Sequence, residues 1–301
     1  MPKQRVAVDR YGIVEGFRMA IDEAREVDLF LGIPFAKPPV GKLRFKVDRW
    51  KEINCFSSDN IHAFGGDPRL VTLFGQSAGG CLDLFHQVVP MAGNAECEWS
   101  TVSRTRLVNS CREFAARKGW DGKNYGKGMD VSKIGLDLAP VVGSTSSDFL
   151  PKSIAELRKE MPKKNIMVGT CEYEGLLFGI SLQDLLRNND CFLNLLFTLA
   201  ATHCTELTYL FGVSVVFGFR FNDSDKQMID LMTRMWTNFA KYGNPNGPYE
   251  DSTVFNFKWE PASLENHTSF LSISEKCEMR TNYKDKLAEF WKDIRIAGKS
   301  V

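Results

Sequence analysis

The chain has 301 residues, of which 44% are hydrophobic and 25% charged, and its formal net charge at pH 7 is +1. This composition is that of a globular protein with a sizeable core, and it excludes a charge-driven binder of nucleic acid or of an anionic membrane surface. The longest apolar runs, 192–201 and 209–219, are too short to span a bilayer. Eight cysteines are scattered without C-x-x-C or zinc-ligand spacing, which favours free thiols in a reducing compartment.

The first part of the chain is predicted to be β-structure followed by a loop. Residues 5–30 alternate apolar and polar side chains in the manner of a hairpin. Residues 31–41 are rich in proline and glycine and predict a loop.

The stretch 70–79 carries the strongest functional signal. Residues 70–74 form a short apolar run that predicts a buried strand, and the next five residues, GQSAG, match G-x-S-x-G, the nucleophile elbow. A sharp strand-to-helix turn exposes a serine hydroxyl beside a base, so Ser77 is the candidate nucleophile. The amide of Ala78 and the helix that begins there would face the developing oxyanion.

Helices dominate the predicted elements after the elbow. Apolar side chains recur with helical spacing in three segments, namely 102–118, 225–242 and 284–294. A short helix is also predicted over 154–160 and a buried strand over 163–169. The methionine-rich stripe of 225–242 is predicted to be core rather than a ligand site.

Longer strings extend these motifs. Residues 64–80 read FGGDPRLVTLFGQSAGG, and residues 32–41 read GIPFAKPPVG. Both strings closely resemble segments of the type B carboxylesterase/cholinesterase family, and residues 202–294 are similar to it as well. The resemblance implies an α/β-hydrolase fold over a single domain, residues 1–301, in which helices flank a mostly parallel central sheet.

The resemblance also implies an internally shortened member of the family. Segments of the family pattern are missing or compressed near 51–60, 81–83, 122–131 and 180–201. The first gap removes the His-Gly-Gly-Gly-type loop that supplies two oxyanion amides in the family, so the central sheet is expected to be incomplete. Gln76 replaces the glutamate common in the family, which with the missing segment favours a broad-specificity carboxylesterase over a cholinesterase.

Elimination among the four histidines identifies the candidate base. His62 precedes the nucleophile strand and is expected to be partly buried. His86 follows soon after Ser77 on the same local element, so it is expected to point away from the serine. His267 lies in an exposed polar run. His203 lies in a small-residue loop, where the resemblance places the family's histidine in the motif H-x-x-E-[LI].

The acid is expected between the serine and the histidine in chain order. Residues 169–175, GTCEYEG, resemble the family's G-x-x-x-[DE]-E-G loop, which places the acid at Glu174 and leaves Glu172 as the alternative. The resemblance implies two-step hydrolysis of a small-molecule carboxylic ester, in which His203 takes the proton of Ser77 and Glu174 orients the imidazole. This chemistry requires neither a metal nor a cofactor.

Three hypotheses remain open. The first is a serine carboxylesterase, the second a catalytically inactive, cholinesterase-like binding or adhesion module, and the third a fragment without function of its own. Retention of serine, acid and histidine favours the first. No signal peptide opens the sequence, which predicts a cytoplasmic protein, whereas an incomplete N-terminus would leave a secreted or ER-lumenal protein with the same appearance.

Overall fold

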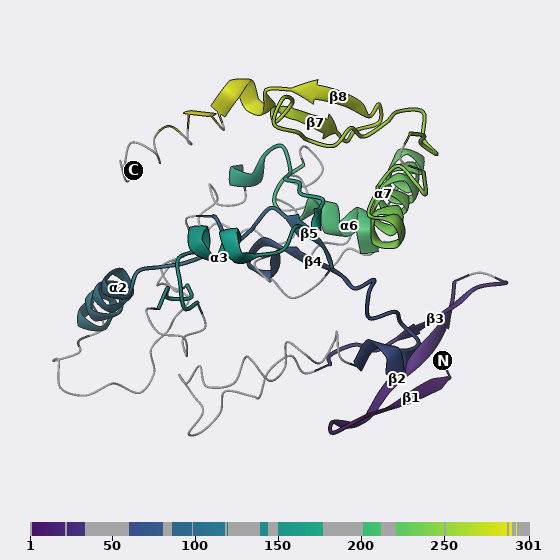
Figure 1. The fold of residues 1–301 in the computed structure, drawn as a ribbon, viewed down its shortest axis with the longest axis horizontal. Helices are drawn as coiled ribbons and strands as arrows, with labels where there is room; N and C mark the ends of the chain where they lie inside the picture. Colours follow the sequence, from purple (N-terminus) through teal and green to yellow (C-terminus); the bar gives the residue numbers. More distant parts are fainter. Residues whose placement is uncertain are drawn as a thin grey trace. The chain divides into compact units, whose positions relative to one another are not determined.

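The computed structural model describes residues 2–33 except 22, 60–80, 86–119 except 98 and 118, 139–143, 150–176, 201–211, 221–287 except 250, 289–290 and 293. The chain divides into two compact units, Met1–Thr170 and Cys171–Val301 (Figure 1). The described residues form a mixed α/β structure with a small parallel sheet in the first unit.

An antiparallel sheet opens the first unit, with strand order β1-β2-β3. Its strands are β1 (Lys3–Val8), β2 (Gly12–Ala20) and β3 (Glu26–Leu29). Gly12 has φ +90° at the turn between β1 and β2, a conformation that glycine adopts without a Cβ clash. The strands confirm the hairpin predicted for 5–30.

A parallel sheet with strand order β4-β5-β6 forms the centre of the first unit. It contains β4 (Thr72–Gln76), β5 (Gln87–Met91) and β6 (Asn165–Ile166). All five residues of β5 are buried, as expected for the middle strand of a parallel sheet. The prediction of a parallel sheet is therefore confirmed for these three strands.

Two strand predictions need correction. The strand predicted at 70–74 begins at Thr72, and Phe74 is 46% exposed rather than buried. In the described part of the chain β4 pairs with β5 on one side only, so its side chains are covered less than those of a central strand. The strand predicted over 163–169 is limited to β6 and is not buried throughout, because Ile166 and Val168 are both more than half exposed.

The predicted helices of the first unit are confirmed. The segment 102–118 contains helix α2 (Arg104–Arg117), in which Phe114 is buried. Helix α3 (Ile154–Glu160) has the predicted bounds. Ser153 caps α3 in a capping box with Glu156, which satisfies two backbone amides at the start of the helix.

The second unit contains helices α6 (Thr205–Phe211) and α7 (Asp223–Tyr242) and an antiparallel pair, β7 (Ser269–Ser272) and β8 (Glu278–Thr281). Its core cluster consists of Met232, Met235 and Leu271, with partly buried apolar side chains packed around them. The methionine stripe of α7 is thus core, as predicted.

Several predictions fall on residues that the structure does not describe. All four shortened segments do so, except for residues 60 and 201 at their ends, and so does most of the loop at 31–41. The helix predicted over 284–294 was wrong at its start, because Lys284 and Asp285, in the 3-10 turn η8 (Tyr283–Lys286), have left-handed φ angles of +52° and +51°. Much of the rest of that segment lies outside the described residues. Within the described residues, no helix is long and apolar enough to cross a membrane.

Candidate active site

Ser77 lies at the carboxyl end of β4, as the first residue of the 3-10 helix η4 (Ser77–Gly80). Its φ of +56° places it in the left-handed region, which is unfavourable for a residue with a side chain. A strained turn that lifts a serine out of the end of a parallel strand is the expected geometry of a nucleophile elbow. Such strain supports a functional hypothesis for Ser77.

The turn after β5 lies directly against this elbow. The paired ends of β4 and β5 are Gln76 and Met91, so the two following turns meet at the same edge of the sheet. A Cβ built on Gly93 would lie 2.2 Å from the carbonyl oxygen of Ser77 and 2.9 Å from the ring of Trp99. The carboxyl edge of a parallel sheet is also where such sheets bind their ligands.

Ala78 is exposed in η4, directly after the candidate nucleophile. The helix expected after the elbow is a 3-10 turn of four residues in the described structure. The role of Ala78 as an oxyanion donor stays a prediction.

His203 is held in a tight turn at the start of α6. Its exposed fraction is 7%, and the preceding Thr202 is fully buried. The amide of Thr202 donates to Oγ1 of Thr205, the first residue of α6, at 3.1 Å. This hydrogen bond ties the turn to the start of the helix. Cys204 has φ +75°, so the backbone is left-handed directly after the histidine. The turn therefore fixes the imidazole of His203 by backbone geometry as well as by burial.

The structure pairs His203 with Glu174. Nδ1 of His203 lies 2.5 Å from Oε2 of Glu174, and the amide of Cys171 donates to the other carboxylate oxygen, Oε1, at 2.6 Å. A parallel bridge between Tyr173 and Thr202 joins the two loops, with the Tyr173 amide donating to the carbonyl oxygen of Ala201 at 2.9 Å. The acid loop and the histidine turn are thus connected by backbone as well as by side chains.

The remaining histidines lie in different surroundings. His62, His86 and His267 are all exposed, so His203 is the buried member of the four. The expectation that His62 is partly buried was wrong, because this residue faces solvent on the 3-10 helix η3 (Ile61–Phe64).

Glu172, the alternative acid, is exposed. The side chain paired with His203 belongs to Glu174. Ser77 belongs to the first unit, and the His203–Glu174 pair belongs to the second. Their roles as nucleophile, base and acid stay predictions.

Two further groups lie beside the pair and were missed in the sequence. The thiol of Cys171 donates to Oε2 of Glu206 at 3.1 Å. Burial raises the pKa of the Glu206 carboxyl, and the hydrogen bond from Cys171 acts in the opposite direction. Both residues stand inside the motifs already quoted, Cys171 in GTCEYEG and Glu206 three residues after His203, but neither motif indicates that they touch.

The cysteines in the described part of the chain are free thiols, as their scattered spacing predicted; they are Cys97, Cys111, Cys171, Cys204 and Cys277. Burial, followed by the charge of Glu206, raises the pKa of Cys204 to about 11. Among the described residues, no group of three or more histidine, cysteine or acidic side chains is placed to hold a metal ion.

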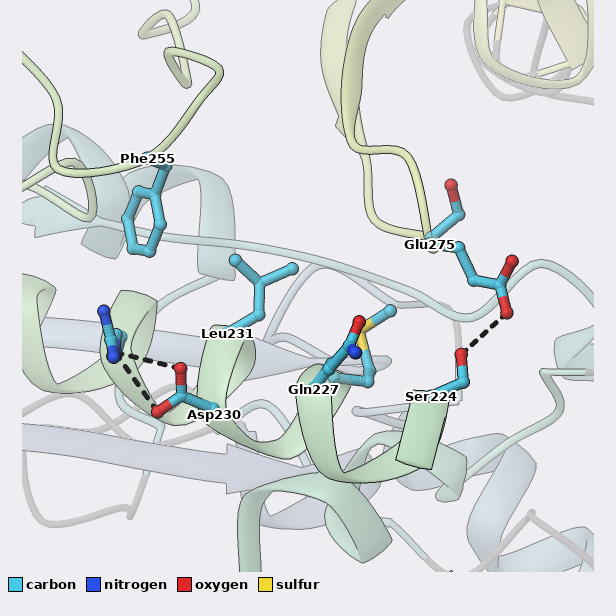
Figure 2. Close-up of a pocket in the computed structure, with 9 residues that line it drawn as sticks. Ser224, Gln227, Asp230, Leu231, Phe255 and Glu275 are labelled. Atoms are coloured by element: carbon cyan, nitrogen blue, oxygen red, sulfur yellow. Dashed lines mark hydrogen bonds and ion pairs between the residues drawn. The ribbon is translucent and has the colours of Figure 1, made fainter. Parts of the chain in front are cut away.

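A pocket of the second unit lies between α7 and the segments that carry Phe255 and Glu275 (Figure 2). Leu231 and Phe255 line it together with polar side chains, and the hydroxyl of Ser224 donates to Oε1 of Glu275 at 2.7 Å across one end. None of the predicted site residues lines this pocket. It is therefore not the reaction site that the motifs predict.

A parallel sheet with a serine in a strained strand-to-helix turn, and a buried histidine paired with a glutamate, is typical of hydrolases that use a serine nucleophile. The sequence model of the carboxylesterase family matches residues 3–52, 56–196 and 181–291 of the chain. The chain therefore belongs to the carboxylesterase family, which confirms the resemblance drawn from its motifs.

Individual relatives cover smaller shares of the chain. Esterase cest-33 of Caenorhabditis elegans is 28% identical over 350 aligned positions, which cover 78% of this chain and 62% of the relative. Neuroligin-2 of Homo sapiens is 32% identical over 108 residues, covering 31% of this chain and 13% of its own length. Esterase B1 of Culex pipiens is 40% identical over 76 residues, covering 22% and 14%. The chain thus spans less than two thirds of the length of these relatives.

Proposed function

We propose that this chain is an internally shortened serine carboxylesterase of the α/β-hydrolase fold, acting on a small-molecule carboxylic ester. The observation that carries the proposal is the 2.5 Å distance between Nδ1 of His203 and Oε2 of Glu174. A buried imidazole oriented by a carboxylate is the base that a serine nucleophile requires. Similarity to esterase cest-33 supports the same class of reaction, and its alignment is longer than this whole chain, which supports internal shortening.

The proposed reaction has two steps that share one base. Because Nδ1 of His203 faces Glu174, Nε2 is the ring nitrogen that takes the proton of the Ser77 hydroxyl as its oxygen attacks the ester carbonyl. The imidazolium returns this proton to the departing alkoxide, and an acyl-serine remains. A water molecule deprotonated by His203 then attacks the acyl group, and the carboxylic acid leaves while Ser77 regains its proton.

Oxyanion stabilisation limits the proposed rate. The amide of Ala78 is the one donor that the sequence retains, and the glycine loop that supplies two more in the family has no counterpart. Loss of one such donor lowers turnover by about 10²–10³-fold in serine hydrolases. The chain is therefore expected to form an acyl-enzyme with an activated ester and to turn over slowly.

Hydrolysis of a 4-nitrophenyl ester tests this proposal. The expected result is a burst of nitrophenol close to the enzyme concentration, followed by a slow phase, with an acyl group located on Ser77 by mass spectrometry. The replacement S77A is expected to abolish the burst and the acyl group. A cooperatively unfolding chain without a burst would favour the inactive binding module, and a chain without cooperative unfolding would favour the fragment.

A further inference from the structure

Cys171 occupies a junction in the second unit. Its amide donates to Oε1 of Glu174 at 2.6 Å, and its thiol donates to Oε2 of Glu206 at 3.1 Å. Its carbonyl oxygen accepts from the hydroxyl of Tyr283 at 3.2 Å. Three groups of one residue are thus engaged, and one of their partners is the acid that faces His203.

Glu206 ties this junction to the helix that follows the base. It lies in the first turn of α6, three residues after His203. The Oε1 atom of Glu206 is buried and has no hydrogen-bond partner in the described part of the chain. The other carboxylate oxygen, Oε2, accepts the hydrogen bond from the thiol of Cys171. The contact therefore joins the loop of Glu174 to the element that carries His203.

The electrostatics of the cluster favour the protonated thiol that donates in this contact. Burial raises the pKa of the Cys171 thiol, and the negative charges of Glu206 and Glu174 act in the same direction, so the thiol keeps the proton that it donates. Burial likewise raises the pKa of the Glu206 carboxyl. The charge of Glu174 acts in the same direction, and that of His203 in the opposite direction.

We propose that the hydrogen bond between Cys171 and Glu206 positions Glu174 for its contact with His203. It fixes the backbone of Cys171, whose amide then holds one oxygen of Glu174 and directs the other at Nδ1. Cys171 and Glu206 are positioning residues, and they need not touch the substrate. This inference rests on the proposed function, because it takes the Glu174–His203 pair to be the acid and base of the proposed ester hydrolysis.

Variants of Cys171 separate the thiol from the amide. C171A keeps the amide and removes the donor, and it is expected to slow fluorophosphonate labelling of Ser77 by about tenfold, a usual cost of leaving a buried acceptor unsatisfied. C171S keeps a donor and is expected to restore the rate. Cys277 offers a matched control, because its thiol is also half-buried and donates to a carbonyl oxygen, that of Ser274, at 3.3 Å.

The expected result is thus a slow C171A, with C171S and C277A close to wild type. Labelling of C171A at the same measurable rate as wild type would overturn the inference. So would a C171S variant as slow as C171A, since the hydrogen bond would then not be the cause.

A proton NMR measurement keeps this test independent of esterase activity. A histidine Nδ1 proton held by a carboxylate gives a downfield resonance, which E174Q assigns by removing it. We expect this resonance in wild type, S77A, C171S and C277A, and a weaker, faster-exchanging one in C171A. If Ser77 is never acylated but the resonance behaves in this way, the esterase proposal fails while the positioning role stands. A resonance unchanged in C171A, or absent from wild type, contradicts the positioning role.

Discussion

Gly93 lies against Ser77 with no space for a side chain between them, since a Cβ on Gly93 would come within 2.2 Å of the Ser77 carbonyl oxygen. Real Cβ atoms do not approach a backbone oxygen so closely, so one of the two turns must move if Gly93 is replaced. The position of the candidate nucleophile therefore depends on a glycine in the turn after the neighbouring strand, β5.

The replacement G93A tests this dependence. It is expected to displace the elbow and to slow labelling of Ser77 by about 10²-fold, because a shift of about 1 Å in a reacting group has such an effect. Gly169 provides the matched control, since it lies at the same sheet edge, bridged to Met91, with no described atom within 4 Å of an added Cβ. G169A should label at the wild-type rate, and equal losses in both variants would show that the close contact is not responsible.

The choice between the two candidate acids can be made by one pair of variants. Glu174 contacts His203, whereas Glu172 is exposed. E174Q is expected to lower kcat/KM for an activated ester by about 10³–10⁴-fold, because an amide stabilises the wrong imidazole tautomer. E172Q should stay within about twofold of wild type, as is usual for exposed positions. The reverse order would assign the acid to Glu172.

Glu206 gives a pH-dependent prediction for stability. Burial raises the pKa of this carboxyl above its ordinary value of 4.5, so the folded chain retains a proton that the unfolded chain releases as the pH rises above 4.5. The contribution of Glu206 to stability is therefore full below pH 4.5 and is lost as the pH rises through the folded pKa. E206Q should gain stability relative to wild type over this interval, measured as the free energy of unfolding in urea at several pH values.

Glu278 provides a control of opposite sign. The hydrogen bond from Arg280 lowers the pKa of this exposed carboxyl. Its contribution is present above the unfolded pKa and is lost as the pH falls through the folded value. E278Q should therefore lose a little stability relative to wild type as the pH rises. A loss of the same sign in E206Q would mean that folding does not raise the pKa of Glu206.

The core of the second unit gives a prediction of stability alone. Met235 is fully buried in the cluster that joins α7 to β7. M235A should lower the free energy of unfolding by about 2–5 kcal/mol, the range for removing a buried side chain of this size. Leu264 is 91% exposed, so L264A should change it by less than about 0.5 kcal/mol. Similar values for the two would contradict the assignment of the core.

Local patterns predicted some elements well. Helix α7 was predicted because its apolar stripe has helical period, and the short helix predicted over 154–160 matches α3 in both bounds. Strand β4 was misjudged because an apolar run does not reveal how many neighbouring strands will cover it. Phe74 shows the consequence: it lies in the apolar run that predicted a buried strand, yet its side chain is 46% exposed.

The candidate site was predictable to a similar extent. His203 was predicted as the base because few histidines compete with it, and Glu174 as the acid because its loop resembles a family motif. The approach of Gly93 to Ser77 and the contact of Cys171 with Glu206 join residues far apart in the chain, and no local pattern contains them. Glu206 also differs from the usual expectation that a glutamate side chain is solvated, since its Oε1 atom is buried.

Labelling with a fluorophosphonate, mapped by mass spectrometry, tests the central claim most directly, because it requires the nucleophile and the base to meet in the folded chain. The account predicts one adduct per wild-type molecule, on Ser77, lost in S77A and H203A and retained in H62A, whose histidine is exposed. A cooperatively folded wild-type chain that remains unlabelled, or that is labelled equally after H203A, would contradict the proposed serine esterase.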